Sequence, residues 1–343
     1  MIRIQNIYYM LAYAFQVLHE QGYKDVATED FENTAELLSA ILCRGVSVQI
    51  KRGLCRQYIT NEEPLGSPRG KIEIGESIKT QAIRKKQLVC AYDEFSVDAY
   101  TNRIIKTTME LLLRANISKT RKKEIRKLLI FFDGVSVLDT HSINWDIQYD
   151  RNNQTYRMII EVCHLVIKGL LQTSADGSTR IMDYADDQTM AKLYEKFILG
   201  YFQREHTDIK AYSPQIAWQV TDGYRTLLPT MQSDIVISNK KTKKTLIIDA
   251  KYYSHNMQMK APYMTQTLHS GNLYQIFTYV KNWNAAPDET ISGMLLYART
   301  DDAIQPDNDY QMSGNQISVK TLDLNCEFAV IAAQLDAIAD SIK

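Results

Sequence analysis

The sequence has no net charge, because its 343 residues include 40 lysines and arginines and 40 aspartates and glutamates. A protein that holds nucleic acid tightly through its overall electrostatic field needs an excess of positive charge. The balance excludes a protein of that kind. Any binding to nucleic acid must therefore be local or shared with a partner.

Cysteine and histidine are scarce and form no metal-binding pattern. The five cysteines are far apart without a Cys-x-x-Cys pair, and the six histidines form no His-x-His or His-Glu-x-x-His motif. These absences argue against a zinc hydrolase, an iron–sulfur protein and a thiol redox enzyme. We expect the cysteines to be reduced and mostly structural, in a cytoplasmic protein.

Long apolar runs and nucleotide-binding motifs are also missing. No apolar stretch approaches the roughly 18 residues that span a bilayer, and the N-terminus has no signal-peptide pattern, so we expect no membrane association. The segment Gly66–Lys71 resembles a phosphate loop but has one residue too few between its glycines and no Ser or Thr after its lysine. Any energy source must come from another chain.

The segment 231–253 contains the residues with the clearest chemistry. Two runs in it, 234–238 and 245–253, are rich in β-branched and aromatic residues, which favours strands, and the polar residues 239–244 between them are typical of a turn. A hairpin closed symmetrically about this turn pairs residues whose numbers sum to 483. Asp234 and Asp249 would then face each other.

Two facing carboxylates need a compensating positive charge. Opposed side chains in an antiparallel pair have Cβ atoms about 4.5–5.5 Å apart, and like charges there are destabilising. Lys251 projects from the same face as Asp249, because side chains alternate along a strand. Two hard oxygen ligands beside an ammonium suit Mg²⁺ or Mn²⁺ and a polarised water. The pattern predicts a hydrolytic metal site at Asp234, Asp249 and Lys251.

The alternative is that these charges lie on a solvated strand face, as they do in many proteins with the same spacing. Against it, Asp249 and Lys251 interrupt the run Leu246–Tyr253, which is otherwise apolar and typical of a buried central strand. A charge in a buried strand is costly unless it is paired or bound to metal. The functional interpretation is therefore favoured.

The remaining pattern predicts an α/β protein of two domains. Gln172–Thr179 is the segment most typical of a linker, so we expect an α+β N-terminal domain over 1–178 and a second domain over 179–343. Asn6 is expected to cap the first helix, and Asp186 or Asp187 the first helix after the linker. The expected helices are 7–15, 31–49, 98–116, 119–132, 154–171, one through 190–201, 272–283 and 328–342. The expected strands are 54–59, 71–74, 88–92, 216–220 and 291–297.

Two basic runs leave their role open. The run Lys119 to Lys127, at the start of the helix expected over 119–132, contains six lysines and arginines, which form either a solvated face or a contact with nucleic acid or an acidic partner. The turn with Lys240, Lys241, Lys243 and Lys244 sits beside the proposed site. It either meets phosphate there or is a solvated hairpin tip.

Three polar residues outside the hairpin are candidates to join it. Glu195 lies at the edge of the apolar stripe of its helix, within reach of a core or a cleft. Gln275 and Tyr279 lie one helical turn apart on one face, although a polar helix face explains this pair equally well.

The order Glu195, Asp234, Asp249-Ala-Lys251 and Gln275-x-x-x-Tyr279 resembles the PD-(D/E)xK nuclease core in its RecB-like variety. Four segments carry a closer resemblance, to the McrC family of nuclease subunits of McrBC restriction systems: Asn6–Phe15, Asn102–Lys106, Asp249–Tyr253 and Asn272–Tyr279. The match extends over nearly the whole chain. The sequence departs from the pattern in two places, because the nearest proline before Asp234 is Pro229 and Ala298 stands where relatives are expected to have proline.

The resemblance implies a C-terminal PD-(D/E)xK endonuclease domain and an N-terminal domain that docks on McrB, a hexameric AAA+ GTPase. It implies that Asp234 and Asp249 bind Mg²⁺, that Lys251 orients or activates water, and that Glu195 supports the metal. Gln275 and Tyr279 would support the site or contact DNA. GTP, and the recognition of double-stranded DNA with modified cytosine, would belong to the partner.

The sequence thus favours a Mg²⁺-dependent DNA endonuclease subunit that an AAA+ GTPase recruits and whose partner GTPase it stimulates. Two alternatives stay open. A PD-(D/E)xK nuclease of DNA repair or phage defence that works alone would cut without GTP. A non-catalytic adaptor that regulates a GTPase would keep its activity when Asp249 is replaced.

Overall fold

The computed structural model describes residues 2–16, 31, 33–149, 153–176, 187–221, 223–260 and 265–343. Within these ranges, no helix combines the length and the apolar character needed to cross a membrane. The described chain is a mixed α/β protein, as the sequence predicts. Two positions that the sequence singles out, Asp186 and the domain boundary after residue 178, lie outside the described residues.

Contacts divide the chain into two compact units, residues 38–174 and residues 1–37 with 175–343. The unit 38–174 combines helices with a small antiparallel sheet of strand order β1-β3-β2. Its elements are α2 (Thr34–Arg52, from Leu38 onward), β1 (Gln57–Leu65), β2 (Lys71–Ile72), α3 (Ile74–Lys79), η2 (Ala82–Lys85), β3 (Leu88–Ser96), α4 (Tyr100–Arg114), α5 (Lys119–Leu129), η3 (Ile130–Phe132), η4 (Gln154–Tyr156) and α6 (Arg157–Asp176).

The helices of this unit follow their apolar periodicity. The apolar stripe of α2 is buried throughout: Leu37, Leu38, Ile41, Leu42 and Val46. Helix α5 begins at the predicted residue, where the Ser118 hydroxyl accepts a hydrogen bond from the Arg121 amide. Helix α6 continues to Asp176, so the expected linker is helical over its first five residues.

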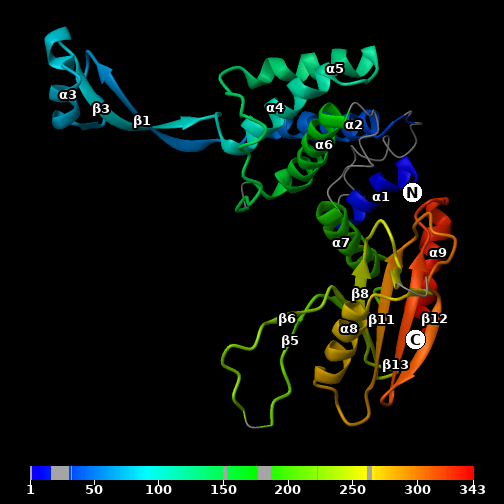
Figure 1. Cartoon of the computed structure of the whole chain (residues 1–343). Helices are drawn as coiled ribbons and strands as arrows, with labels where there is room; N and C mark the ends of the chain where they lie inside the picture. The colour runs from blue at the N-terminus through cyan, green and yellow to red at the C-terminus, as the bar shows by residue number, and fades with distance from the viewer. Residues whose placement is uncertain are drawn as a thin grey trace. The chain divides into compact units, whose positions relative to one another are not determined.

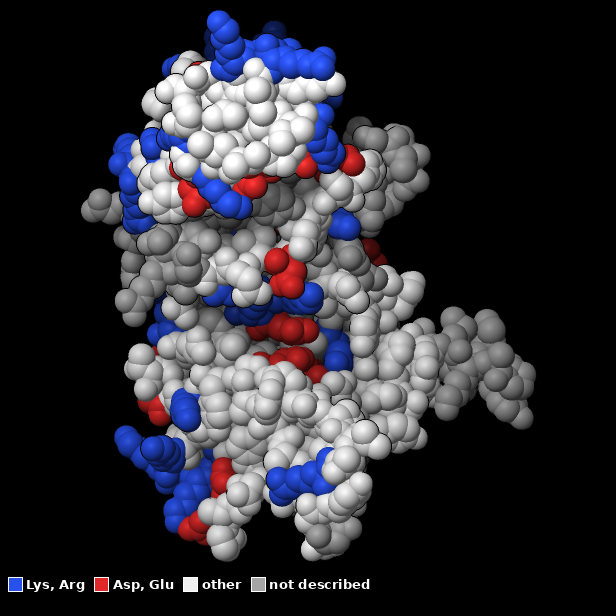
Figure 2. All heavy atoms as spheres, turned by 90° about the vertical axis from the view of Figure 1, so that its left-hand side faces the viewer, with Lys and Arg blue, Asp and Glu red and all other residues white. Residues whose placement is uncertain are grey.

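Strands β1 and β3 form a long arm (Figure 1), because all nine residues of one pair with all nine of the other. The expected strand 71–74 is shorter than predicted, since Ile74 already begins α3. Ile74, Ile78 and Ile83 expose half or more of their surface at the end of the arm. Figure 2 looks onto this end, where a pale surface has blue lysines and arginines above it and at its sides, and both blue and red residues along its lower border.

A six-stranded mixed sheet forms the centre of the other unit, with strand order β12-β13-β11-β8-β7-β4. Strand β11 runs parallel to β8 and β13, and the remaining neighbours are antiparallel. The strands of this unit are β4 (Lys210–Tyr212), β5 (Gln215–Ile216), β6 (Met231–Gln232), β7 (Ile235–Asn239), β8 (Lys244–Lys251), β9 (Gln258–Lys260), β10 (Thr265–Thr267), β11 (Thr290–Ala298), β12 (Asn308–Met312) and β13 (Asn315–Leu322).

Helix α8 (Ser270–Asn282) is the crossover between the parallel strands β8 and β11, and it packs on one face of the sheet. Its Ile276 and Val280 lie above Gly293, where an added Cβ would approach both side chains to 2.8 Å. Ile247 of β8 belongs to the same cluster. Residues of β8 at odd positions therefore face α8, which places Asp249 and Lys251 on that side.

Helix α1 (Ile4–Ala14) packs against α7 (Asp187–Glu205) and therefore belongs to the unit that contains the six-stranded sheet, whereas the sequence placed it in the N-terminal domain. Tyr13 contacts Phe197 and Tyr201 of α7. Tyr13 also stacks on Phe328, the first residue of α9 (Phe328–Asp340).

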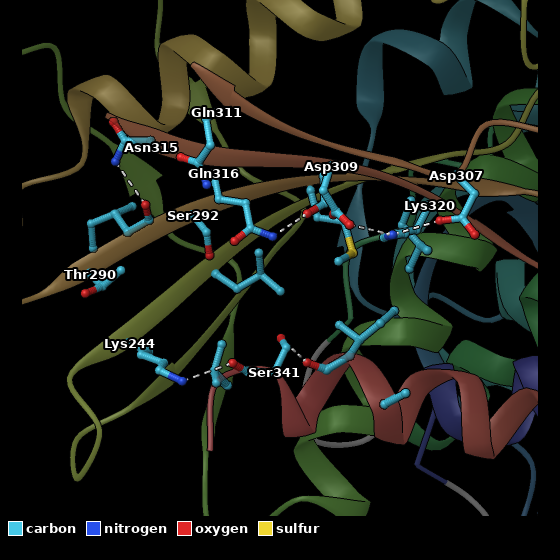
Figure 3. Close-up of a pocket in the computed structure, with 18 of the residues that line it drawn as sticks. Lys244, Thr290, Ser292, Asp307, Asp309, Gln311, Asn315, Gln316, Lys320 and Ser341 are labelled. Atoms are coloured by element: carbon cyan, nitrogen blue, oxygen red, sulfur yellow. Dashed lines mark hydrogen bonds and ion pairs between the residues drawn. The ribbon is translucent and has the colours of Figure 1, made fainter. Parts of the chain in front are cut away.

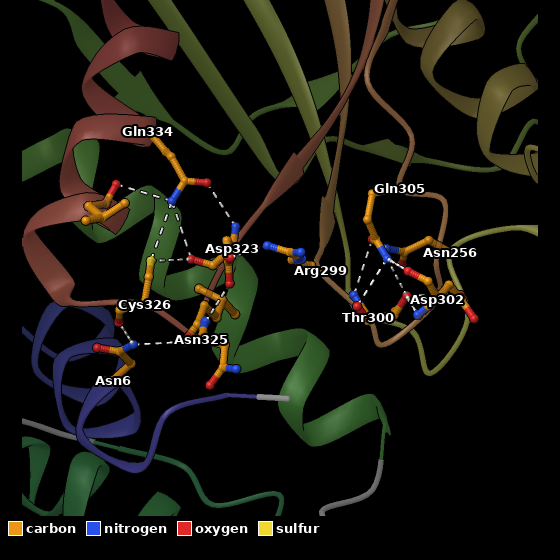
Figure 4. Close-up of polar contacts among 12 residues, drawn as sticks. Asn6, Asn256, Arg299, Thr300, Asp302, Gln305, Asp323, Asn325, Cys326 and Gln334 are labelled. Carbon is orange, nitrogen blue, oxygen red and sulfur yellow. Dashed lines mark hydrogen bonds and ion pairs between the residues drawn. The ribbon is translucent and has the colours of Figure 1, made fainter.

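Asn6 does not cap α1, because the helix begins two residues earlier and Asn6 is buried inside it. Its side-chain amide donates hydrogen bonds of 2.8 Å to the carbonyls of Leu324 and Cys326 (Figure 4). The asparagine thus ties α1 to the loop before α9. Its polarity serves a tertiary contact, which the helix-capping rule does not anticipate.

The structure also differs from the prediction at two further sets of strands. The strand predicted over 216–220 is reduced to β5, which ends at Ile216. The hairpin of β12 and β13 is absent from the prediction, although its turn has the expected chemistry, since Ser313 and Gly314 both adopt positive φ. This hairpin completes the edge of the sheet beyond β11.

Candidate active site

Asp234 and Asp249 come together through the register of the β7–β8 hairpin. Ile235 pairs with Ile248 and Asn239 with Lys244, so paired residue numbers sum to 483, as the symmetric hairpin predicts. Asp234 is the residue immediately before β7 and comes next in this register, opposite Asp249. The Asp234 Oδ2 atom accepts a hydrogen bond of 2.8 Å from the Ala250 amide, which fixes its carboxyl against β8.

Lys251 supplies the positive charge that the two carboxyls need. Its Nζ lies 2.7 Å from Asp249 Oδ2. The Asp249 side chain is completely buried, and the Lys251 side chain is 13% exposed. The alternative that these charges lie on a solvated strand face is therefore wrong for this pair. An ion pair at this depth is strongly coupled, because little water screens it.

The pKa values at the site reflect crowded, buried negative charge. Burial, together with the charges of Asp249 and Glu195, raises the pKa of Asp234 to about 8. Burial also raises the pKa of Asp249, against the attraction of Lys251. Burial alone would lower the pKa of Lys251, but Asp249 and Asp234 outweigh it and raise that pKa. The site thus stabilises bound positive charge.

Helix α8 holds the Lys251 ammonium from the other side. Lys251 Nζ donates to Gln275 Oε1 at 3.1 Å, and Gln275 Nε2 donates to the Tyr279 hydroxyl at 2.8 Å. That hydroxyl in turn donates to the Gln232 carbonyl at 2.9 Å. The chain of contacts runs from β8 through α8 to β6. Gln275 therefore contacts Lys251 directly and Tyr279 contacts Gln275, so the two do not form an independent polar helix face, and their support of the site's chemistry stays a prediction.

Glu195 of α7 lies within electrostatic reach of the same cluster. Burial raises its pKa, while Lys251 opposes and Asp249 reinforces that shift. Among the described residues, however, no three His, Cys, Asp or Glu side chains converge closely enough to hold a metal by themselves. Glu195 is an electrostatic neighbour of the pair, and its role as a metal ligand stays a prediction.

The donor set of the two aspartates suits a hard divalent cation. The buried Oδ1 atom of Asp249 accepts no hydrogen bond from the described part of the chain. Carboxylate oxygens are preferred ligands of Mg²⁺, which keeps several waters and needs only one or two protein carboxylates. Asp234 and Asp249 together therefore fit such an ion, with solvent or substrate completing its coordination.

The basic turn lies at the wrong end of the hairpin to join this site. Lys244 begins β8 and Asp249 follows five residues later, which corresponds to roughly 16 Å along a strand. Lys243 pairs with Asp288, and Lys244 donates to the Ser341 carbonyl. The expectation that these lysines sit beside the carboxylates is therefore wrong.

A groove of about 900 Å³ lies on the opposite face of the sheet (Figure 3). Leu246 of β8 lines it, whereas the adjacent Ile247 faces α8. Lys320 in its wall is held between Asp307 and Asp309, at 2.7 and 3.0 Å. The groove is thus separated from Asp249 and Lys251 by the sheet itself.

Sequence patterns did not identify the residues that order the chain beyond Lys251. The side-chain amide of buried Asn256 donates to the Ala298 carbonyl at 2.8 Å and to Gln305 Oε1 at 3.1 Å. Gln305 bonds in turn to Thr300 (Figure 4). A lone asparagine and glutamine have no motif, so only the fold shows that they bind the segment after β8 to the end of β11.

Comparison with known proteins gives consistent matches. A family described as "McrBC 5-methylcytosine restriction system component" matches residues 4–298. The Type IV methyl-directed restriction enzyme EcoKMcrBC of Escherichia coli strain K12 is 30% identical over 347 residues, which cover 99% of this chain and 97% of that protein. A half-complex of Thermococcus gammatolerans McrB AAA+ hexamers with bound McrC has a TM-score of 0.49 and 17% identity, over 99% of this chain and 76% of that one. A second structure, the McrBC complex of the same organism, has a TM-score of 0.37 and 19% identity, over 49% and 55%.

Proposed function

The chain belongs to the family of McrBC 5-methylcytosine restriction system components, and we propose that it is the metal-dependent DNA endonuclease subunit of such a system. The observation that carries the proposal is the buried pair of Asp234 and Asp249 with Lys251 bound to it. This arrangement supports a PD-(D/E)xK active site. It keeps two carboxylates and one ammonium in a fixed geometry, which phosphodiester hydrolysis requires.

Each residue of the site has a distinct role in this proposal. Asp234 and Asp249 would hold Mg²⁺, or Mn²⁺ in its place, and the bound ion would supply Lewis acidity to a water and to the reacting phosphate. Lys251 keeps its proton because both aspartates raise its pKa. Its ammonium adds positive charge where the attacked phosphate gains negative charge. Gln275 orients that ammonium, and Glu195 adds negative charge at the edge of the site.

The partner in this proposal is an McrB-like hexameric AAA+ GTPase. The absence of a nucleotide-binding motif from this sequence supports a system in which the partner binds GTP and reads modified cytosine in double-stranded DNA. The unit 38–174 is the part available to dock on it and to stimulate GTP hydrolysis. The exposed isoleucines at the end of its arm are suited to contact with another protein, since such patches are uncommon on free surfaces.

The test is cleavage of cytosine-methylated plasmid DNA in the presence of Mg²⁺. Three reactions are compared: the chain alone, the chain with its partner GTPase and GTP, and the same pair without GTP. The proposal predicts double-strand cleavage only in the complete mixture, together with faster GTP hydrolysis than the partner shows alone.

The rivals give different results in the same experiment. Cleavage by the isolated chain without GTP would replace the proposal with a nuclease that works alone. Stimulated GTP hydrolysis with intact DNA in every reaction would replace it with a non-catalytic adaptor.

A further inference from the structure

The two units of the chain have opposite charges that cancel in the whole protein. Residues 38–174 contain 22 lysines and arginines against 14 aspartates and glutamates, a net charge of +8. The remaining residues contain 18 against 26, a net charge of −8. The unit with the carboxylate site therefore repels a polyanion overall. Any surface that holds DNA by its backbone is expected on the other unit.

Helix α5, drawn in Figure 1, concentrates positive charge, because six of its eleven residues are lysine or arginine. Its exposed cations recur at helical spacing, four, three and one residues apart, and form one stripe: Lys119, Lys123, Arg126 and Lys127. Ile125 and Leu128 lie buried on the opposite side. The stripe is about 12 Å long, at roughly 1.5 Å per residue.

In the described part of the chain, no carboxylate is paired with these cations. The one carboxylate of α5, Glu124, lies 2.7 Å from Arg121. Within the described residues, none of the four stripe cations forms an ion pair with an Asp or Glu side chain. A solvated helix face ordinarily mixes both signs at neighbouring positions, so this face differs from one.

The arrangement also opposes the stability of the helix. Lys119 and Lys123, and Lys123 and Lys127, are like charges at i and i+4, which repel each other. Lys119, Arg121 and Lys122 lie in the first turn, where the helix dipole favours negative charge. A bound polyanion would relieve both penalties, because it supplies the negative charge that the sequence omits.

Contacts just beyond the C-terminal end of α5 hold the helix, and with it the stripe, in a fixed position. The Lys106 ammonium of α4 donates to the carbonyls of Phe132 and Val135, at 3.3 and 2.6 Å, just beyond the end of α5. Ile125 of α5 and Phe132 just beyond it are fully buried. The exposed cations therefore project from a fixed surface, which lowers the entropy lost when they bind.

We propose that the exposed face of α5, formed by Lys119, Lys123, Arg126 and Lys127, binds the phosphate backbone of duplex DNA without reading its sequence. The ligand class rests on the proposed nuclease function, which requires DNA to be held near the complex. Lysine is depleted in protein interfaces, whereas it is a common phosphate ligand, so DNA fits the stripe better than an acidic protein does. The stripe's length matches two or three phosphates on the near side of a duplex.

The test measures binding of the full chain to a fluorescein-labelled, unmodified DNA duplex by fluorescence anisotropy, with EDTA present to prevent cleavage. One variant carries Lys119→Gln, Lys123→Gln, Arg126→Gln and Lys127→Gln. The matched control removes four charges elsewhere, through Lys240→Gln, Lys241→Gln, Lys243→Gln and Lys244→Gln. Circular dichroism verifies that both variants are folded.

We expect the α5 variant to bind about tenfold or more weakly, and the slope of log K against log salt to fall by about 2 to 3 between about 50 and 200 mM salt. The control variant should keep most of the binding affinity and most of the salt dependence. Equal losses in the two variants would overturn the inference. So would wild-type DNA binding by an α5 variant that no longer stimulates the partner GTPase, since the face would then bind protein.

Failure of the proposed nuclease function and failure of the DNA-binding proposal give different results. If no mixture cuts DNA but the α5 variant alone loses binding, the DNA surface stands and the nuclease assignment falls. If the α5 variant binds and cuts DNA like the wild type, the nuclease assignment stands and the proposed DNA-binding surface is wrong.

Discussion

The Asp234 carboxyl accepts a hydrogen bond from the backbone amide of Ala250, the residue that separates Asp249 from Lys251. One contact therefore locks the acid from the start of β7 onto the strand that carries the other acid and the lysine. The backbone of β8 does not depend on side-chain identity, so the geometry persists when the charges are altered.

The stability of the metal-free protein should depend on the proton of Asp234. Its pKa is raised from about 4 to about 8 in the folded chain, so folding favours the protonated acid and stability falls as pH rises through that window. Asp234→Asn keeps an oxygen for the Ala250 amide and removes the ionisation. In urea unfolding with EDTA, its advantage over wild type should grow by about 4 kcal/mol between pH 5 and pH 9. An advantage independent of pH would show that Asp234 is ionised normally.

Divalent metal should stabilise the folded chain through the same pair. Because a bound ion needs the carboxylate form, it displaces the Asp234 proton and binds more tightly as pH rises toward and past 8. At an ion concentration about 100 times the dissociation constant, Mn²⁺ or Mg²⁺ should add about 2.7 kcal/mol. Thermal unfolding at pH 6 and pH 8.5 measures this, with Asp249→Asn as control. An equal rise in Tm for that variant would place the metal elsewhere.

The hairpin could be predicted because its information is local. The residues of β7 and β8, the turn between them and the facing aspartates all follow from strand propensity and a two-residue period. The position of Lys251 follows from the same period. Recognition of Glu195, Gln275 and Tyr279 needed the family resemblance, because each alone fits an ordinary helix face.

The parts that sequence patterns missed depend on distant contacts. Asn6 has the chemistry of a helix cap, but its partners are the carbonyls of Leu324 and Cys326, more than 300 positions away. Lys240 to Lys244 follow the Asp234 segment closely in sequence, yet the extended strand carries them away from the site. Strand β12 has only five residues, and β13 buries three consecutive residues, so a two-residue period did not distinguish the pair from a loop.

Gln275 should act on cleavage through Lys251 alone. Gln275→Ala removes the acceptor that holds the ammonium at 3.1 Å, and we expect cleavage by the complete complex to slow about tenfold. The loss should vanish in a Lys251→Ala background, because a residue that only positions another has no effect once that one is gone. Equal losses in both backgrounds would give Gln275 a separate role, such as contact with DNA.

Gly200 should be intolerant of a side chain because α1 lies against it. A Cβ there would come within 2.3 Å of the Tyr13 carbonyl, a backbone atom that cannot rotate away. Gly200→Ala is expected to destabilise the chain by about 2–3 kcal/mol in urea unfolding. Gly271→Ala in α8 is the control, since its Cβ would meet open space and should change stability by less than about 1 kcal/mol. Similar stabilities of the two variants would contradict the packing of α1 on α7.

The most direct test of the central claim is cleavage of methylated plasmid DNA by the complex formed with Asp249→Asn. The variant is isosteric and lies in a strand whose backbone contacts remain, so stimulation of the partner GTPase should survive. Asp288→Asn is the matched control, because Asp288 is exposed and pairs with Lys243 at the other end of the sheet. The account predicts that Asp249→Asn lowers the cleavage rate by about 100-fold or more while Asp288→Asn leaves it unchanged. Cleavage by Asp249→Asn at the wild-type rate would show that the carboxylate pair is not the catalytic site.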